Sequence, residues 1–311
     1  MSGRAAENKR LSDKIEKIHA ESPDKGYRRI NDDLRHDYGI YVNDKRVLRI
    51  CRVVDIKSTI KYSSHGCTRQ AKNPRYVAEN LLDRQFHAEK PNEKWLTDVT
   101  EFKWYDGPIV HKLYLSAILD LYDRRIVSFA ISEHNDNPLV FKTFDKAVKA
   151  NPNAHPLFHS DRGFQYTSRA FHHRLQQTGM TQSMSRVAHC IDNGPMEGCW
   201  GILKRERYYG RRFFSKQELA QMIVSYIHYY NTRRVQRNLG IWTPLEKYLL
   251  ALAAYKRPAD LPLLAGKILI FFLCPLDGVR FTRRCARALK RKSKGRRTTR
   301  PPAPPSLKKI P

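Results

Sequence analysis

Apolar residues recur at helical spacing near the beginning of the chain. Leu11, Ile15 and Ile18 lie three or four positions apart, which predicts an amphipathic helix with one buried face. A Ser-Pro-Asp sequence at residues 22–24 interrupts this pattern with cap and turn chemistry. A second helix is therefore expected to begin near residue 26 and to end near Gly39.

A third helix, with a basic outer face, is expected over residues 44–54, and Asn43 is a suitable cap for it. The residues expected to be buried are Val47, Leu48, Cys51 and Val54, and those expected outside are Lys45, Arg46, Arg49 and Arg52. Three short helices of which the last is basic resemble a helix-turn-helix, whose recognition helix enters the major groove of DNA. A charged helical hairpin with a solvated face fits residues 1–55 equally well.

Residues 56–92 have the composition of a linker. Between Lys57 and Arg75 there are several cations, no acids and many Ser, Gly, Asn and Pro residues. Such a strap could follow a phosphate backbone or could simply be solvated. Residues 80–86 are expected to form a short helical piece that docks on the following domain.

A different pattern begins at Trp95 and continues to about residue 250. Residues 95–104, 112–122 and 124–132 are rich in β-branched and aromatic side chains and predict three strands. Helices then alternate with short strands: helix 139–150, strand 156–160, helix 168–179, strand 181–185, helix 196–206 and helix 216–234. This order predicts an α/β layer fold for residues 93–250.

The charge of the chain favours a polyanionic partner. The 311 residues carry a net charge of +28 at pH 7 and have a pI near 10.0, while 41% hydrophobic residues suffice for a core. Such a balance favours nucleic acid, with a ribosome-associated protein as the plain alternative. Sixteen of the basic residues follow residue 250, against Asp260 and Asp277 alone, so half of the excess lies in residues 251–311. This tail is predicted to be largely disordered.

Other classes of site and of location are disfavoured by the cysteines and by the hydropathy pattern. The six cysteines form no C-x-x-C pair, so a structural zinc site is not expected, and their scatter indicates a reduced, intracellular protein. The charged N-terminus has no apolar signal core, and the apolar run at 268–274 is far too short to span a membrane. We expect a soluble protein without a membrane partner.

Three acids predict a metal site that acts on phosphodiesters. Asp98 lies in the first strand, Asp161 directly follows a later strand, and Glu197 lies on a helix thirty-five residues further on. Converging carboxylates bind hard divalent cations, which can activate an attacking oxygen and stabilise the leaving one. Lys204 follows Glu197 by seven positions, so both would share one face of a continuous helix.

Two other acids compete for this role. Asp120 ends the most apolar strand, where ligands often gather. Asp192 is expected to be a loop acid that caps the helix of Glu197. A tyrosine recombinase is disfavoured, because no Arg/His/Arg array accompanies the tyrosines.

Six ordered blocks carry a family resemblance: WLTDVTEF, LYLSAILDLYDRRIVSF, HSDRGFQYTS, SMSRVAHCIDNGPMEGCWGILKRE, YIHYYNTRR and LGIWTPLE. Together they closely resemble the DDE transposases of bacterial insertion sequences, in particular the OrfB-type subunit, whose core is similar to retroviral integrases. The segment from Gly26 to Ile50 resembles the helix-turn-helix that precedes this core. The resemblance covers roughly residues 10–250 and implies a ribonuclease-H-like fold, a mixed five-stranded sheet with helices on both faces.

The resemblance also implies roles for individual residues. Asp98, Asp161 and Glu197 would be the catalytic, metal-binding triad, with two Mg²⁺ or Mn²⁺ ions, and Asp120 would be structural. Ser160 and Gly163 would shape the loop of the second acid, and Asn193 would belong to the motif before the glutamate. DNA contacts are expected from Lys204, Arg205, His159, Arg162, Lys45, Arg46 and Arg49.

The implied reaction cuts and joins DNA at the ends of an insertion sequence. A water, and then the liberated 3′-hydroxyl, would attack a phosphodiester in line without a covalent enzyme intermediate. The implied partners are terminal inverted repeats, target DNA, further copies of the chain and an OrfA-type companion, in the bacterial cytoplasm and on the nucleoid. Residues 251–311 match nothing in the family, which leaves an inactive, decayed or repurposed DNA-binding protein as an alternative. A nuclease that cuts without joining is a weaker one.

Overall fold

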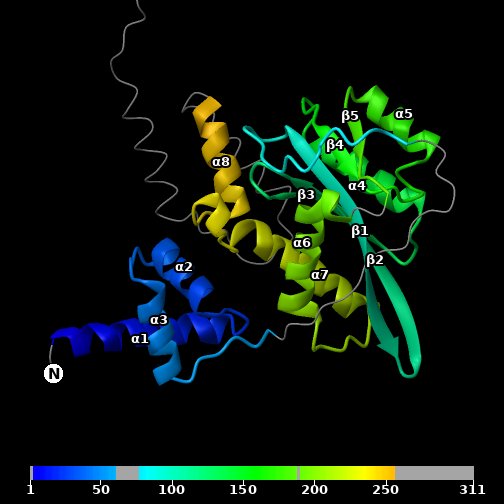
Figure 1. The fold of residues 1–311 in the computed structure, drawn as a ribbon. Coiled ribbons are helices and arrows are strands. Elements are labelled where there is room, and N and C mark those ends of the chain that lie inside the picture. The colour runs from blue at the N-terminus through cyan, green and yellow to red at the C-terminus, as the bar shows by residue number, and fades with distance from the viewer. Residues whose placement is uncertain (1–2, 61–76, 188–189, 256–311) are drawn as a thin grey trace, which may run out of the picture. The chain divides into compact units, whose positions relative to one another are not determined.

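The computed structural model describes residues 3–60, 77–187 and 190–255 (Figure 1). The chain divides into two units, Met1–Tyr248 and Leu249–Pro311. The predictions for the middle of the linker, 61–76, and for nearly all of the basic tail, 256–311, lie outside the described residues. In the part of the chain that is described, no helix is long and apolar enough to cross a membrane.

Three helices form the N-terminal region: α1 (Gly3–Glu21), α2 (Tyr27–Asp37) and α3 (Asp44–Val53). The predicted cap is present, since the Asn43 side chain accepts a hydrogen bond from the backbone of Lys45 at 2.8 Å. Their common core contains Leu11, Ile15, Ile18, Ile30, Leu34, Val47, Ile50 and Cys51. Of the residues expected inside α3, Val47 and Cys51 are buried, whereas Leu48 and Val54 are only partly buried. Ile50 is buried instead, because the buried face of α3 follows positions 47, 50 and 51.

A five-stranded sheet follows, in the order β3-β2-β1-β4-β5. Its strands are β1 (Lys94–Asp106), β2 (Ile109–Asp120), β3 (Ile126–Ser132), β4 (Leu157–Ser160) and β5 (Thr181–Met184). The first three are antiparallel, whereas β4 runs parallel to β1 and β5 parallel to β4. This is the mixed ribonuclease-H-like sheet that was predicted.

Helices cover both faces of the sheet, each over its own core. On one face, α4 (Asn137–Ala150) and α5 (Arg169–Gln177) share with the sheet a core that includes Trp95, Phe144, Phe158 and Phe171. On the other, α6 (Gly194–Leu203) and α7 (Lys216–Thr232) share with it a core that includes Leu96, Phe102, Trp200 and Tyr226. Three short helical turns and a last helix complete the described fold: η1 (Cys190–Asn193), η2 (Lys204–Tyr208), η3 (Arg237–Leu239) and α8 (Pro244–Tyr255).

Two predictions about helices need correction. Residues 80–86 dock on the domain through the buried Leu82, as expected, but they form a turn and not a helix. The Asn80 side chain closes this turn by accepting from the backbone of Asp83, and Asp83 and Arg84 both have positive φ, which no helix tolerates. The helix of Glu197 is also shorter than predicted: α6 ends at Leu203, and η2 continues it as a π-helix.

Candidate active site

Because side chains alternate along a strand, Asp98 points to the face of the sheet that α6 covers. Leu96 and Phe102 belong to the core under α6, and Asp98 lies between them at the same period of two. The indole Nε1 of Trp200, on α6, donates a hydrogen bond to the Asp98 Oδ2 at 3.0 Å. This helix therefore fixes the orientation of the first carboxylate.

Asp161 reaches the same level of the sheet from the neighbouring strand. Leu96 of β1 pairs with His159 of β4, and the strands are parallel, so the second residue after each of them is an aspartate. The backbone N–H of Gly163 donates to the Asp161 Oδ1 at 2.9 Å. A Cβ at Gly163 would lie 3.0 Å from that oxygen, so any larger residue would displace the carboxylate.

Glu197 lies in the first turn of α6 and remains partly exposed. A carboxylate at this end of a helix is favoured by the helix dipole. The start of α6 is fastened to β1, because the Asn193 side chain donates to the carbonyl of Thr97 at 3.1 Å. One strand thus holds the first acid and anchors the helix of the third.

The three carboxylates are close enough to perturb one another. Burial raises the pKa of Asp98 to about 8, and repulsion from Asp161 and then Glu197 adds to this, although Trp200 opposes it. Burial also raises the pKa of Asp161. The pKa of Glu197 is raised by burial and by the charge of Asp161. Mutual repulsion of this kind is typical of acids assembled around a cation.

The donor chemistry fits a hard divalent ion, since all three groups offer carboxylate oxygens. The side chains have not converged, however. Among the described residues, no three His, Cys, Asp or Glu side chains form a group that could hold a metal ion as they stand. A bound ion would need Asp98, Asp161 and Glu197 to close in, and its charge would offset the burial that raises their pKa values and the repulsion on Asp98 and Glu197.

Lys204 lies beside the carboxylates as η2 begins. Its Nζ lies 5.2 Å from the centroid of the Phe102 ring, over the face of the ring. Burial lowers the pKa of Lys204, and the charges of Asp98 and Glu101 oppose that shift. The side chain is only partly exposed, as is that of Arg205. Lys204 therefore lies within reach of a ligand that approaches the acids.

His159 does not lie where it could contact DNA. Its side chain has no exposed surface, and its Nδ1 and Nε2 lie 2.9 and 3.1 Å from the hydroxyls of Ser183 and Ser185. Burial lowers the pKa of His159 to about 4, so the ring is neutral at pH 7. The ring lies beneath the loop of Asp161 and links β4 to the end of β5 through these two hydrogen bonds. Arg162 is partly exposed and donates to the carbonyl of Ser185 at 2.7 Å.

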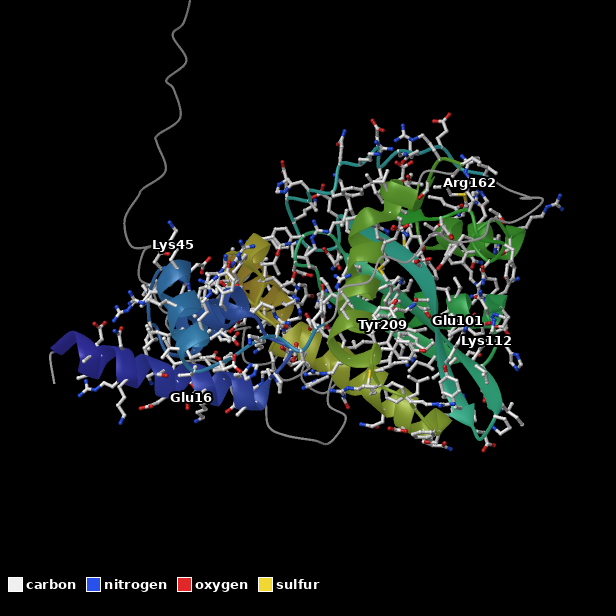
Figure 2. All side chains as sticks on the ribbon, turned by 60° about the horizontal axis from the view of Figure 1, so that its bottom comes forward. Glu16, Lys45, Glu101, Lys112, Arg162 and Tyr209 are labelled. Atoms are coloured by element: carbon white, nitrogen blue, oxygen red, sulfur yellow. The ribbon has the colours of Figure 1, made fainter. Side chains whose placement is uncertain are left out.

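The three basic residues of α3 differ in their availability. Lys45 and Arg49 are exposed, and Figure 2 shows Lys45 on α3. Arg46 instead binds α1, with its guanidinium 3.0 Å from the carboxylate of Glu7 and 2.8 Å from the side chain of Asn8. Arg46 is therefore already engaged within the helical region.

Both competing acids have structural partners. The carboxylate of Asp120 accepts from the backbone of Asn92 and Tyr122 and from the indole of Trp95. Asp192 is fully buried in η1, where it accepts from Arg84 and Arg186. The prediction that Asp192 caps α6 is wrong, because two guanidinium groups occupy its oxygens.

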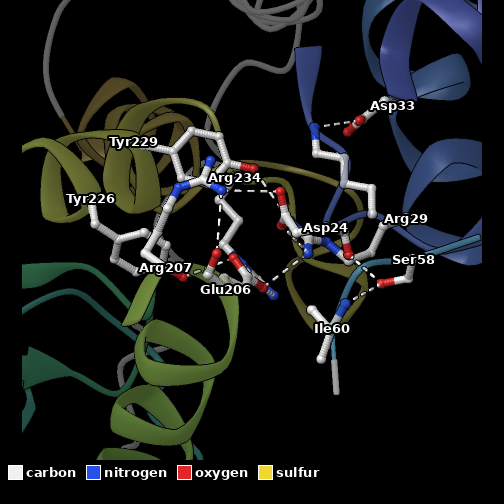
Figure 3. A network of polar contacts seen from close by, with 11 residues as sticks. Asp24, Arg29, Asp33, Ser58, Ile60, Glu206, Arg207, Tyr226, Tyr229 and Arg234 are labelled. Carbon is white, nitrogen blue, oxygen red and sulfur yellow. Dashed lines mark hydrogen bonds and ion pairs between the residues drawn. The ribbon is translucent and has the colours of Figure 1, made fainter. Parts of the chain in front are cut away.

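A network of ion pairs around the buried carboxylate of Glu206 was not predicted from the sequence (Figure 3). Glu206 lies in η2 and binds Arg234 at 2.9 Å and Arg29, on α2, at 3.0 Å. Asp24 in turn binds Arg29 and Arg207, at 3.0 and 3.1 Å. Charges this far apart in sequence carry no periodic signal, so only the fold reveals the cluster.

Family models match most of the described chain. The integrase core domain matches residues 88–190 and 197–248, and an HTH-like domain matches residues 6–63. The putative transposase InsK of insertion sequence element IS150, from Escherichia coli K12, is 40% identical over 71% of this chain and 76% of its own length. The chain belongs to the insertion-sequence transposases.

Other relatives carry similar names. An uncharacterized transposase-like protein of Haemophilus influenzae is 39% identical over 66% of this transposase and 93% of its own length. The transposase of IS904 from Lactococcus lactis is 34% identical over 76% and 94%. Among solved structures, the catalytic core of HTLV-2 integrase in complex with magnesium covers 52% of this chain and 99% of its own, with 18% identity and a TM-score of 0.41. Membership of this family indicates DNA cleavage and strand transfer as the reaction class and DNA as the partner.

Proposed function

We propose that this transposase cuts and joins DNA strands at insertion-sequence ends with Asp98, Asp161 and Glu197 as its metal-binding triad. The observation that carries the proposal is the placement of Asp98 and Asp161 at one level of neighbouring parallel strands, with Glu197 close enough to act on Asp98 through its charge. Burial and the charge of Asp161 raise the pKa values of both Asp98 and Glu197. Carboxylates with strongly perturbed pKa values cluster at functional sites.

Mg²⁺ or Mn²⁺, as a pair of ions, would supply charge neutralisation at the scissile phosphate and activation of the attacking oxygen. The residues around the acids have supporting tasks. Trp200 orients Asp98 through its N–H, and Gly163 orients Asp161. Lys204 would neutralise a phosphate next to the one that is attacked.

The N-terminal helices would hold DNA through Lys45 and Arg49, with α3 as the recognition helix. Arg162 and Arg205 would contribute phosphate contacts nearer the acids. We further propose that several copies of the chain assemble on DNA, together with an OrfA-type companion.

The test uses a DNA duplex that carries the terminal inverted repeat and measures both free cut ends and joined products. Asp161→Asn should abolish both in Mg²⁺ and in Mn²⁺. Asp145→Asn, an exposed acid on α4, is the matched control and should keep both. Metal-dependent products that persist in Asp161→Asn would refute the assignment. Binding without products in the unchanged chain would instead indicate the inactive DNA-binding protein.

A further inference from the structure

The outer half of the β1–β2 hairpin extends past the rest of the sheet (Figure 1). β4 pairs with β1 only at residues 94–96, and β3 pairs with β2 only at residues 114–119. Residues 102–113 therefore form a two-stranded arm, in which the ends of β1 and β2 pair with each other and with no other described strand. At about 3.3 Å per residue, this arm begins roughly 13 Å along β1 from Asp98.

A basic loop lies along the edge of this arm. Tyr105 donates its backbone N–H to the carbonyl of Phe213 at 2.9 Å, and the Tyr208 hydroxyl accepts from the backbone of Lys103 at the same distance. These contacts bring Arg211 and Arg212 next to the strand. The guanidinium of Arg212 lies 4.3 Å from the centroid of the Tyr105 ring.

The cations of the arm are largely uncompensated. Lys103, Arg211 and Arg212 are exposed and form no ion pair with any described residue. Lys112 lies opposite Lys103 in the register, but it binds Glu101 at 3.0 Å, and both partners are visible on the hairpin in Figure 2. Two further acids lie nearby: Asp106 at the hairpin turn, and Glu218, whose carboxylate accepts from the backbone N–H of Phe214 at 3.1 Å.

An aromatic ring accompanies these charges. Phe214 is 66% exposed, although it follows the buried Phe213, and Arg212 lies 5.9 Å from the centroid of its ring. Cations that alternate with exposed aromatic rings fit the phosphates and the sugar or base faces of nucleic acid. Lys204 adds a cation at the base of the arm, where it lies over Phe102 on the α6 face of β1.

We propose that Lys103, Arg211, Arg212 and Phe214 form a second DNA contact, the arm patch, which binds phosphates away from the cleaved bond. Lys103 and Tyr105 lie five and seven residues beyond Asp98, which corresponds to roughly 16 to 23 Å. Successive phosphates of one DNA strand are about 3.4 Å apart along the axis, so the arm patch would contact the duplex about five to seven base pairs from the cleaved bond. The inference rests on the proposed function, because distances are counted from the bond that Asp98 would help to cleave. It concerns the binding of DNA and not its cleavage.

The experiment compares the triple variant Lys103→Ala/Arg211→Ala/Arg212→Ala with the control triple Lys142→Ala/Lys149→Ala/Arg169→Ala. The control removes three exposed cations from α4 and α5, on the other face of the sheet. All chains also carry Asp161→Asn, so that DNA binding is measured without turnover. The probe is a duplex with the terminal inverted repeat, titrated at several salt concentrations.

We expect the arm triple to lower the slope of log affinity against log salt by about 2 to 3, at about 0.9 per lost phosphate contact. The control triple should leave that slope unchanged. A duplex that ends four base pairs from the cleaved bond should bind equally to the arm triple and to the parent chain. An unchanged slope in the arm triple, an equal fall in both triples, or a loss confined to self-association would overturn the proposal. Since turnover is not measured, failure of the proposed chemistry would appear separately, in the cleavage assay.

Discussion

One hydrogen bond determines the orientation of the first acid. Trp200 donates its indole N–H to Asp98 at 3.0 Å, while the rest of its ring belongs to the core under α6. Stability and function can therefore be separated at this residue, because a smaller aromatic ring keeps most of the packing but removes the donor.

Trp200→Phe should reduce cleavage by roughly tenfold or more, since a hydrogen bond to a charged group contributes about 1.5–3 kcal/mol. The Mg²⁺ concentration for half-maximal activity should rise, because Asp98 loses the group that favours its charged form. The measurement is cleavage as a function of Mg²⁺, and a fall in activity with unchanged metal dependence would count against a positioning role.

Gly163 tests the loop of the second acid. In Gly163→Ala the new Cβ would lie 3.0 Å from Asp161 and 3.1 Å from Gln165, so the carboxylate must move. Activity should fall at least tenfold, while the urea midpoint should change little. Gly198→Ala is the control for stability, because a Cβ there meets nothing within 4 Å, and it should raise the stability of α6 by up to about 1 kcal/mol. An equal loss of folding stability and of activity in Gly163→Ala would contradict this account.

At the scale of elements, η2 connects the active site to the N-terminal helices. It begins at Lys204 and contains Glu206, which binds Arg234 and Arg29. A π-helical turn is rare and is often found at functional sites. The buried carboxylate of Glu206 gives a physical reason for this one, because it directs the turn toward two guanidinium groups.

Glu206→Gln should destabilise the protein by about 3 kcal/mol, since it leaves two half-buried guanidinium groups without their shared, buried carboxylate. Tyr226→Phe, which removes only the hydroxyl that donates to Glu206 at 2.9 Å, should cost about 1 kcal/mol. Urea unfolding of both variants checks this order. Equal effects would mean that the ion pairs contribute little.

At the scale of the whole molecule, the described part of Met1–Tyr248 is held together by ion pairs between distant segments. Arg237 binds Asp32 at 2.8 Å and Asp44 at 3.1 Å. His36 binds Glu246 at 2.9 Å and Asp37 at 2.6 Å. Burial opposes the charge of His36, but these two carboxylates outweigh it and raise its pKa to about 9.

The stabilisation from His36 should depend on pH. Its folded pKa lies above the ordinary value of 6.5, so the contribution is complete below pH 6.5 and is lost as the pH rises through 9. His36→Gln should cost roughly 3 kcal/mol at pH 6 and much less at pH 9.5. The check is the difference in urea midpoint between the unchanged chain and the variant at both pH values. A constant difference would show that the ring remains neutral.

The sequence predicted the order of strands and helices well, because those signals are local. The β-branched and aromatic residues identified β1, and the short apolar run identified β4. The burial of Ile50 in place of Leu48 depends on how the three N-terminal helices pack together. The spacing of apolar residues along one helix does not determine that packing. The engagement of Asp192 by Arg84 and Arg186, and the enclosure of His159 by two serines, depend on segments that only the fold brings together.

The central claim is that Asp98, Asp161 and Glu197 bind divalent cations together. Titration calorimetry with Mn²⁺ tests it most directly, on the full chain and on Asp161→Asn. The unchanged chain should bind Mn²⁺ and release protons as it does so, since the carboxylates with raised pKa values must ionise. Asp161→Asn should bind at least tenfold more weakly, and equal Mn²⁺ affinity in the two proteins would contradict the account.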